Sequence, residues 1–170
     1  MDLLPLMKAR YSVRRYADTP VEEEKLQLVL EAARIAPTAK NMQPFRVHVV
    51  EKEESLEKLR TLTPCAFNAP VVLMFCGVEE ESARSPLDGR SWAQMDTTIA
   101  MTHAVLEAQS LGLSTCIVGW YDMNAVHDVF QLPEGENVWA LLPLGYAAED
   151  AVPSQVHEKR KPMDEIANRI

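Results

Sequence analysis

The chain has 170 residues, of which 47% are hydrophobic and 25% are charged. This length and composition fit one domain over residues 1–170 with a real core, and they exclude a disordered chain. The 17 basic and 25 acidic residues give a formal net charge of −8, which argues against a nucleic-acid partner because the field of the protein repels a phosphate backbone.

Helical and strand patterns alternate along the chain, without repeats or a linker that would divide it. Apolar residues at helical spacing predict helices, and short apolar or alternating runs predict strands. We therefore expect the α+β class, with a central mixed sheet flanked by helices on both sides. The predicted elements, in chain order, are helix 2–9, helix 20–36, strand 45–50, helix 53–62, strand 71–77, helix 91–111, strand 114–119, helix 124–130 and strand 138–146.

Three of these elements have features that matter later. Thr19 and Pro20 have the N-cap and first-turn residue types that predict the start of the second helix, and Pro37 ends it. The helix over 91–111 has almost no wholly polar face, which indicates burial in the core or in a subunit contact. Pro143 is expected to break the last strand, and the tail from Ala147 onward is polar and extended.

The chain shows no sign of a membrane protein or a metal site. Its longest strongly apolar run, near 70–78, is too short to span a bilayer. Asp2 and Pro5 do not suit a signal peptide, so we expect a cytoplasmic protein. The three cysteines and four histidines lack metal-ligand spacing, and we interpret the cysteines in apolar runs as inert thiols rather than metal or redox centres.

The stretch ARYSVRRY, residues 9–16, reverses the charge of an otherwise acidic chain. In an extended segment, Arg10, Ser12 and Arg14 lie on one side. Guanidinium and hydroxyl groups in such an arrangement favour a phosphate or carboxylate ligand. A solvated basic patch that pairs with the following acidic helix is the alternative, and these residues alone leave both interpretations open.

Three further stretches carry polar or flexible residues at the ends of predicted elements. The loop APTAKNMQPF, residues 36–45, offers Thr38, Asn41 and Gln43 to a heteroaromatic ring edge, unless the loop only satisfies its own groups. Gly119, in SLGLSTCIVGW, allows a ligand to approach the backbone closely. The basic segment HEKRKP, residues 157–162, either folds back toward Arg10 or is solvated.

In this order, the motifs resemble the nitroreductase family over essentially the whole chain. The resemblance rests on R-x-S-V-R, A-P-T-A-x-N-x-Q-P-F, N-A-P-V-V-L, L-G-L-S-T-C-I-V-G, L-P-L-G-Y and R-K-P. It implies a single nitroreductase-like FMN-binding domain and an intertwined homodimer whose two flavin sites are shared between subunits. The apolar helix 91–111 and the extended tail then form an interface that buries more than ~2,000 Å² in total.

The family resemblance also assigns a role to each candidate site residue. Arg10, Ser12 and Arg160 hold the FMN phosphate, with Lys159 as a second tail candidate. Arg14 reaches the pyrimidine end of the flavin ring, where a cation stabilises the reduced form. The backbone N–H groups of Val118 and Gly119 face the N5 edge. The residues expected to come from the other subunit and cover the ring and ribityl chain are Pro37, Thr38, Ala39 and Asn41, with Gln43 near them.

The implied activity is ping-pong oxidoreduction. NADH or NADPH gives a hydride to flavin N5, and an oxidised acceptor such as a nitroaromatic, quinone or enone then takes it. Because the cofactor carries the chemistry, no catalytic acid or nucleophile is predicted. His103, on the long helix, is interpreted as a packing or interface residue.

The sequence departs from the family pattern at several positions. Pro64, Cys65 and Ala66 replace a lysine or asparagine that many relatives direct at the flavin ring. Ala39 removes a side-chain donor from the loop, and Glu158 replaces a basic residue that some members use for the phosphate.

Two other kinds of function stay open on the sequence alone. One is a specialised enzyme of the same fold, such as a dehalogenase or a flavin-fragmenting enzyme, for which residues 79–90 are the lid candidate. The other is a non-enzymatic flavin carrier or sensor.

Overall fold

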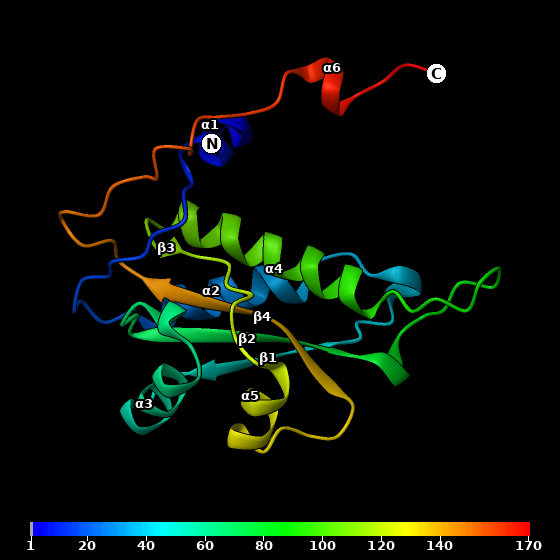
Figure 1. Ribbon diagram of the computed structural model, residues 1–170, viewed down its shortest axis with the longest axis horizontal. Helices are drawn as coiled ribbons and strands as arrows, with labels where there is room; N and C mark the ends of the chain where they lie inside the picture. The colour runs from blue at the N-terminus through cyan, green and yellow to red at the C-terminus, as the bar shows by residue number, and fades with distance from the viewer. Residues whose placement is uncertain (1) are drawn as a thin grey trace.

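The computed structural model describes residues 2–170 and is built around a four-stranded sheet in the order β1-β2-β4-β3 (Figure 1). All three strand pairs are antiparallel. Within the described residues, parallel pairing is confined to an isolated bridge between Ser12 and Thr115. The strands are β1 (Phe45–Val50), β2 (Val71–Val78), β3 (Ser114–Thr115) and β4 (Glu136–Gly145).

Helices lie on both sides of this sheet, so the predicted α+β class is confirmed (Figure 1). The predicted mixed sheet is wrong in one respect, because its named strands pair only in antiparallel fashion. Among residues 2–170, no helix has both the length and the apolar character needed to cross a bilayer. Short 3-10 turns, η1 to η3, occupy Ala39–Asn41, Pro64–Ala66 and Glu79–Glu81. The α-helices are α1 (Leu3–Ala9), α2 (Glu23–Arg34), α3 (Glu53–Leu62), α4 (Ala93–Ser110), α5 (Met123–Phe130) and α6 (Met163–Ile166).

Strand β2 supports the two cores, one on each face of the sheet. Seven consecutive residues of β2 are buried, as predicted for a strand covered on both faces. Because successive side chains point to opposite faces, Leu73 and Phe75 pack with α2 and α4. Met74 and Cys76 pack on the other face, with α3 and α5.

A β-bulge in β4 changes which of its side chains face each core. The register passes from Phe75↔Ala140 to Cys76↔Val138, so Trp139 is the extra residue. A bulge of this kind reverses the alternation of side chains along the strand. Ala140 therefore belongs to the α2/α4 core, whereas Val138 belongs to the α3/α5 core.

Pro143 interrupts β3 rather than β4, which corrects the sequence prediction. Strand β4 runs unbroken through Pro143, but β3 ends at Thr115 instead of residue 119. The Cys116 N–H donates to the Pro143 carbonyl at 3.3 Å. Pro143 has no N–H to return the bond. The ladder is therefore broken at Pro143 and resumes only as an isolated bridge between Val118 and Leu141. The pairing of Pro143 with Val72 on β2 persists.

The start of α2 also differs from the prediction. The helix begins at Glu23, with Glu22 as its N-cap residue, not at Thr19 and Pro20. The Tyr146 hydroxyl donates to the Glu22 carboxylate at 2.7 Å, and Lys25 forms an ion pair with Glu22 at 3.2 Å. Tyr146 lies beyond the end of β4, so a partner distant in the sequence holds the N-cap residue Glu22 and overrides the local preference of the Thr-Pro pair.

The packing of β4 against the start of β2 predicts a cost for any side chain at Gly145. A Cβ added there would lie 2.8 Å from Cδ of the Pro70 ring. Because the ring is rigid, we expect Gly145→Ala to lower the free energy of unfolding by roughly 1–3 kcal/mol in urea denaturation. Gly119→Ala is the matched control, since a Cβ at Gly119 meets no atom within 4 Å. Equal midpoints for the two variants would contradict this packing.

Candidate functional site

The residues of the first basic motif line a cavity of about 210 Å³ beside the tail of the chain. Its lining, all within the described residues, contains three arginines and no carboxylate. An anion would therefore meet several guanidinium donors there and no like charge. The lining residues are Arg10, Tyr11, Ser12, Arg14, Ser154, Val156, His157 and Arg160.

The extended backbone of this motif explains why its arginines differ in their partners. Ser12 bridges to Thr115 and Tyr16 to Ala147, which attaches the segment to the edge of the sheet. Arg15 points elsewhere and pairs with Asp150 at 2.7 Å. Within residues 2–170, neither Arg10 nor Arg14 forms a side-chain hydrogen bond or an ion pair. Two guanidinium groups at the cavity are thus available to a ligand.

The structure separates the two tail candidates. Arg160 lines the cavity with Arg10, whereas Lys159 is absent from its lining. The Arg160 guanidinium donates from Nη1 to the carbonyl of Lys159 at 2.8 Å and to the carbonyl of His157. These bonds hold the Arg160 side chain against the backbone of its own tail segment. Arg160, near the C-terminus, thus joins Arg10 and Arg14, near the N-terminus, in one cavity.

The second motif forms a stiff loop between α2 and β1. The Gln43 N–H donates to Thr38 Oγ1 at 3.0 Å, and Gln43 Nε2 donates to the Asn41 carbonyl at 3.0 Å. The loop therefore satisfies several of its own groups, as the alternative interpretation expected. Lys40, Asn41 and Gln43 all have positive φ angles, between 52° and 55°. Such strain in non-glycine residues is found preferentially at functional sites.

Asp96 fixes this loop to α4, and sequence reasoning did not single it out. Its side chain is buried in the first turn of α4. Asp96 Oδ1 accepts a hydrogen bond from the Ala39 N–H at 3.0 Å, while Oδ2 is buried without a partner. An acidic residue in a first helical turn is a weak signal of capping, but nothing local indicates a partner at residue 39.

The two groups of predicted site residues lie at opposite ends of α4. Asp96 holds the 37–43 loop at the N-terminal end, whereas the Arg10 segment pairs with β3, just after the C-terminal end. Figure 1 shows β3 and the light-blue segment near residue 40 at these two ends. The 18 residues of α4 span about 27 Å at 1.5 Å per residue. One small-molecule site in one chain cannot include both groups.

Val118 and Gly119 differ in their capacity to bind a ligand. The Val118 N–H already donates to the Leu141 carbonyl at 2.9 Å, so it cannot serve a flavin as predicted. Gly119 is exposed and has open space beside it, which leaves its N–H as the candidate. Thr63 Oγ1 donates to the Trp120 carbonyl at 2.6 Å, which brings the segment Pro64–Ala66 near Gly119.

Cys116 is buried close to Arg14, one of the arginines of the cavity. Burial raises its pKa, and the nearby Arg14 guanidinium opposes that shift. The thiol is therefore protonated at neutral pH, which agrees with its interpretation as a packing residue.

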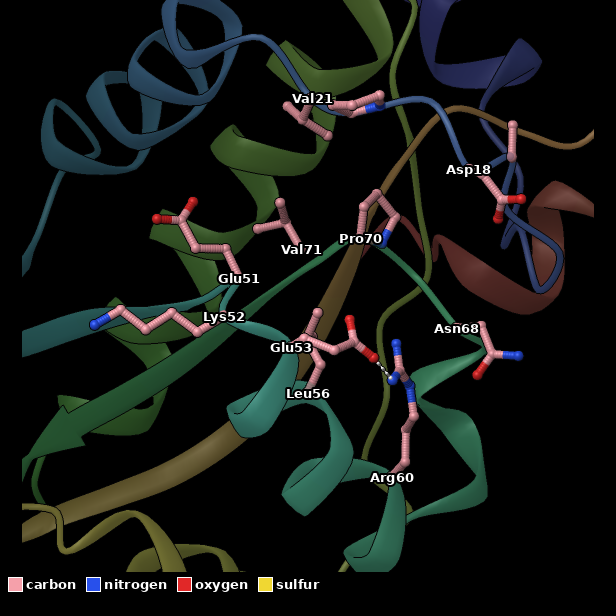
Figure 2. A pocket seen from close by; sticks show the side chains of 12 residues that line it. Asp18, Val21, Glu51, Lys52, Glu53, Leu56, Arg60, Asn68, Pro70 and Val71 are labelled. Carbon is pink, nitrogen blue, oxygen red and sulfur yellow. Dashed lines mark hydrogen bonds and ion pairs between the residues drawn. The ribbon is translucent and has the colours of Figure 1, made fainter.

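A larger cavity, about 600 Å³, lies elsewhere and shares no residue with the predicted site. Figure 2 shows it between the chain leading into α2, the start of α3 and the start of β2. Its charged groups have both signs, and Arg60 is paired with Glu53 at 2.6 Å. This balance gives the cavity no clear preference for an anion or a cation.

Comparison with known proteins identifies the family. The family model described as "Nitroreductase family" matches residues 7–67 and 61–146. The chain belongs to the nitroreductase family. A Methanothermobacter thermautotrophicus protein, provisionally named NADH dehydrogenase/NAD(P)H nitroreductase, is 34% identical over 157 residues, covering 88% of this chain and 80% of the relative.

Solved structures of the family share this fold. A nitroreductase family protein of Clostridium difficile 630 is 36% identical, with a TM-score of 0.92 over 99% of this chain and 98% of that one. A provisionally assigned nitroreductase of Exiguobacterium sibiricum 255-15, solved in complex with FMN, is 22% identical. Its TM-score is 0.85, with coverage of 100% of this chain and 98% of that one.

The Asp96 contact predicts that this carboxylate controls the mobility of the 37–43 loop. We expect Asp96→Ala to speed amide exchange at Ala39 roughly tenfold, because a hydrogen bond to a buried charged group is lost. Hydrogen exchange followed by NMR measures this, and Asp96→Asn, which keeps an Oδ1 acceptor, is the control. Unchanged exchange at Ala39 in Asp96→Ala would show that the loop is held by its internal bonds alone.

Proposed function

We propose that this member of the nitroreductase family is an FMN-dependent oxidoreductase that uses NADH or NADPH. The acceptor class is an oxidised small molecule such as a nitroaromatic, quinone or enone. The name of the Methanothermobacter relative supports the nucleotide donor, and the FMN complex of the Exiguobacterium protein supports the cofactor.

The observation that carries the proposal is the arginine-lined cavity. A chain of net charge −8 keeps Arg10, Arg14 and Arg160 around one space without a carboxylate in its lining. Three like charges at one site repel one another unless an anion joins them. The donor set fits a phosphate monoester, because planar guanidinium groups and the Ser12 hydroxyl offer several directed hydrogen bonds.

The proposed site residues act on the cofactor through their positions and charges. Arg10, Ser12 and Arg160 would hold the phosphate, and Arg14 would favour negative charge on the ring system. The Gly119 N–H would donate to the ring edge. When bound, FMN supplies hydride acceptance and donation. The protein supplies no acid or nucleophile in this proposal; it binds, orients and shields.

We further propose that two chains form a homodimer in which each site is shared. The 37–43 loop and the arginine cavity are separated by α4 within one chain, and a twofold axis can bring one chain's loop to the other's cavity. The strained, preorganised loop residues Asn41 and Gln43 are exposed in the single chain. Pro37, Thr38 and Ala39 complete the surface that would cover the flavin.

Unpartnered apolar surfaces support such a dimer. Helix α1 buries no residue in its own chain, and its Leu3 and Leu4 are 54% and 58% exposed. On the outer side of α4, Met95 is 53% exposed. The hydroxyl groups of Thr98 and Thr102 donate to the carbonyls four residues earlier, at 2.7 and 2.8 Å. Because these hydroxyl groups bond within the helix, the exposed part that each threonine offers to a second chain is its methyl group.

A charge on the outer side of α4 tests the shared site. We expect Thr98→Glu to convert the dimer to a monomer and to abolish FMN retention together, because burying an unpaired carboxylate costs several kcal/mol. Light scattering after size exclusion and the flavin-to-protein absorbance ratio measure the two effects. Lys58→Glu, on the exposed side of α3, is the control. A monomer that keeps its flavin would disprove shared sites.

The phosphate assignment is tested at Arg10. We expect Arg10→Ala to weaken FMN binding by roughly 2 kcal/mol, about 30-fold, because a charge-assisted hydrogen bond is lost. Equilibrium dialysis gives the dissociation constants. Arg15→Ala removes the same charge nearby but outside this cavity, so it is the matched control. Equal losses in both variants would indicate a general charge effect.

The decisive experiment for the function is an absorption spectrum of the purified protein, followed by anaerobic addition of NADH and then NADPH. A yellow protein that bleaches supports the oxidoreductase. A yellow protein that neither nucleotide bleaches would instead favour a flavin carrier or sensor. A colourless protein that takes up no FMN would overturn the proposal.

A further inference from the structure

Three side chains able to ligate a metal meet on the face of the sheet opposite α4. They are His48 on β1, Cys76 on β2 and Glu136 on β4, and each offers a ligand atom within 4.8 Å of the other two. Within residues 2–170, this is the one group of three or more such residues. His48 Nε2 and Glu136 Oε2 are hydrogen-bonded at 2.5 Å, and this bond must lengthen for both atoms to bind one tetrahedral ion.

The backbone explains how residues so far apart in the sequence meet. Cys76 and His48 share a face because the antiparallel register pairs His48 with Met74, two residues before Cys76 on the same side of β2. The bulge in β4 aligns Cys76 with Val138, and Val78 with Glu136. Without the extra residue Trp139, the Glu136 side chain would point toward α2 and α4.

The burial of this cluster is not explained by packing alone. Cys76 is fully buried and Glu136 is only 8% exposed, and a buried carboxylate is costly unless it is paired. Its partner, His48, gives full charge compensation only when protonated. Arg46 is the β1 residue paired in register with Cys76, but its side chain forms an ion pair with Glu81 at 2.6 Å.

We propose that His48, Cys76 and Glu136 bind a zinc ion. One imidazole, one thiolate and one carboxylate are ligands that Zn²⁺ accepts in tetrahedral sites, and three protein ligands leave the fourth position to water. On binding, the Cys76 thiol releases its proton to solvent as the Zn–S bond forms. Nδ1 or Nε2 of neutral His48 and one Glu136 oxygen complete the protein ligands.

An opening exists on the His48 side. The His48 side chain is 33% exposed and lines a cavity of about 280 Å³ with Ser55 of α3 and Phe130 of α5. An ion can therefore enter from solvent without passing through the buried Cys76. Once bound, it would join β1, β2 and β4, so it would act as a cross-link of the sheet.

Zinc retention tests this site independently of flavin and activity. The tag-free full chain is dialysed against limiting ZnCl₂ and its metal content is measured by mass spectrometry. We expect one zinc per chain, and at least tenfold weaker retention in Cys76→Ser, His48→Gln and Glu136→Gln. Cys65→Ser and His127→Gln are the matched controls, since both residues lie outside the cluster.

A second measurement starts from the wild-type chain and uses Cys76→Ser as its control. Co²⁺ added to the wild-type chain should give intense ligand-field bands of a tetrahedral thiolate site, at wavelengths longer than flavin absorption, and Zn²⁺ should remove them. Absence of these bands, or zinc retention by Cys76→Ser equal to that of wild type, would overturn the proposal. If Co²⁺ gives the same bands in Cys76→Ser as in the wild-type chain, the ion is bound adventitiously elsewhere, and the proposal is overturned.

Discussion

The structure depends on strand β2, because it is buried on both faces along almost its whole length. A strand in this position must have a helical layer on each side, since each face exposes apolar side chains that only another element can cover. The α2/α4 layer covers one face and the α3/α5 layer covers the other. The Arg10 segment and the 37–43 loop lie at the two ends of α4 in the first layer, and the proposed zinc ligands lie beneath the second.

Helix α4 determines how the first layer can be used. Its buried face fixes it against the sheet, and its two ends hold the strained loop and the arginine segment apart. A rigid helix between two halves of a binding site makes a single chain an incomplete binding unit, which is why the proposed cofactor site requires a second copy. The outer side of the same helix carries the apolar surface that such a copy would cover.

Local sequence patterns located most elements because alternation and helical spacing involve only near neighbours. Strand β1 and helix α3 have the bounds that the sequence predicted. The predictions failed at α2 and β3, where partners distant in the sequence decide. Tyr146 binds Glu22 and so sets the helix start. Pro143 cannot donate to the strand beside it, and its effect therefore falls on β3 rather than on its own strand.

By itself, the sequence determined that Arg10, Ser12 and Arg14 share one side, because the two-residue period of an extended backbone is a local property. The remaining features were decided by the tertiary structure alone. Arg160 joins that cavity through the path of the tail, and Asp96 reaches Ala39 across two elements. His48, Cys76 and Glu136 meet through strand register and one bulge. Register and bulges depend on pairing between distant strands, and no local residue pattern encodes them.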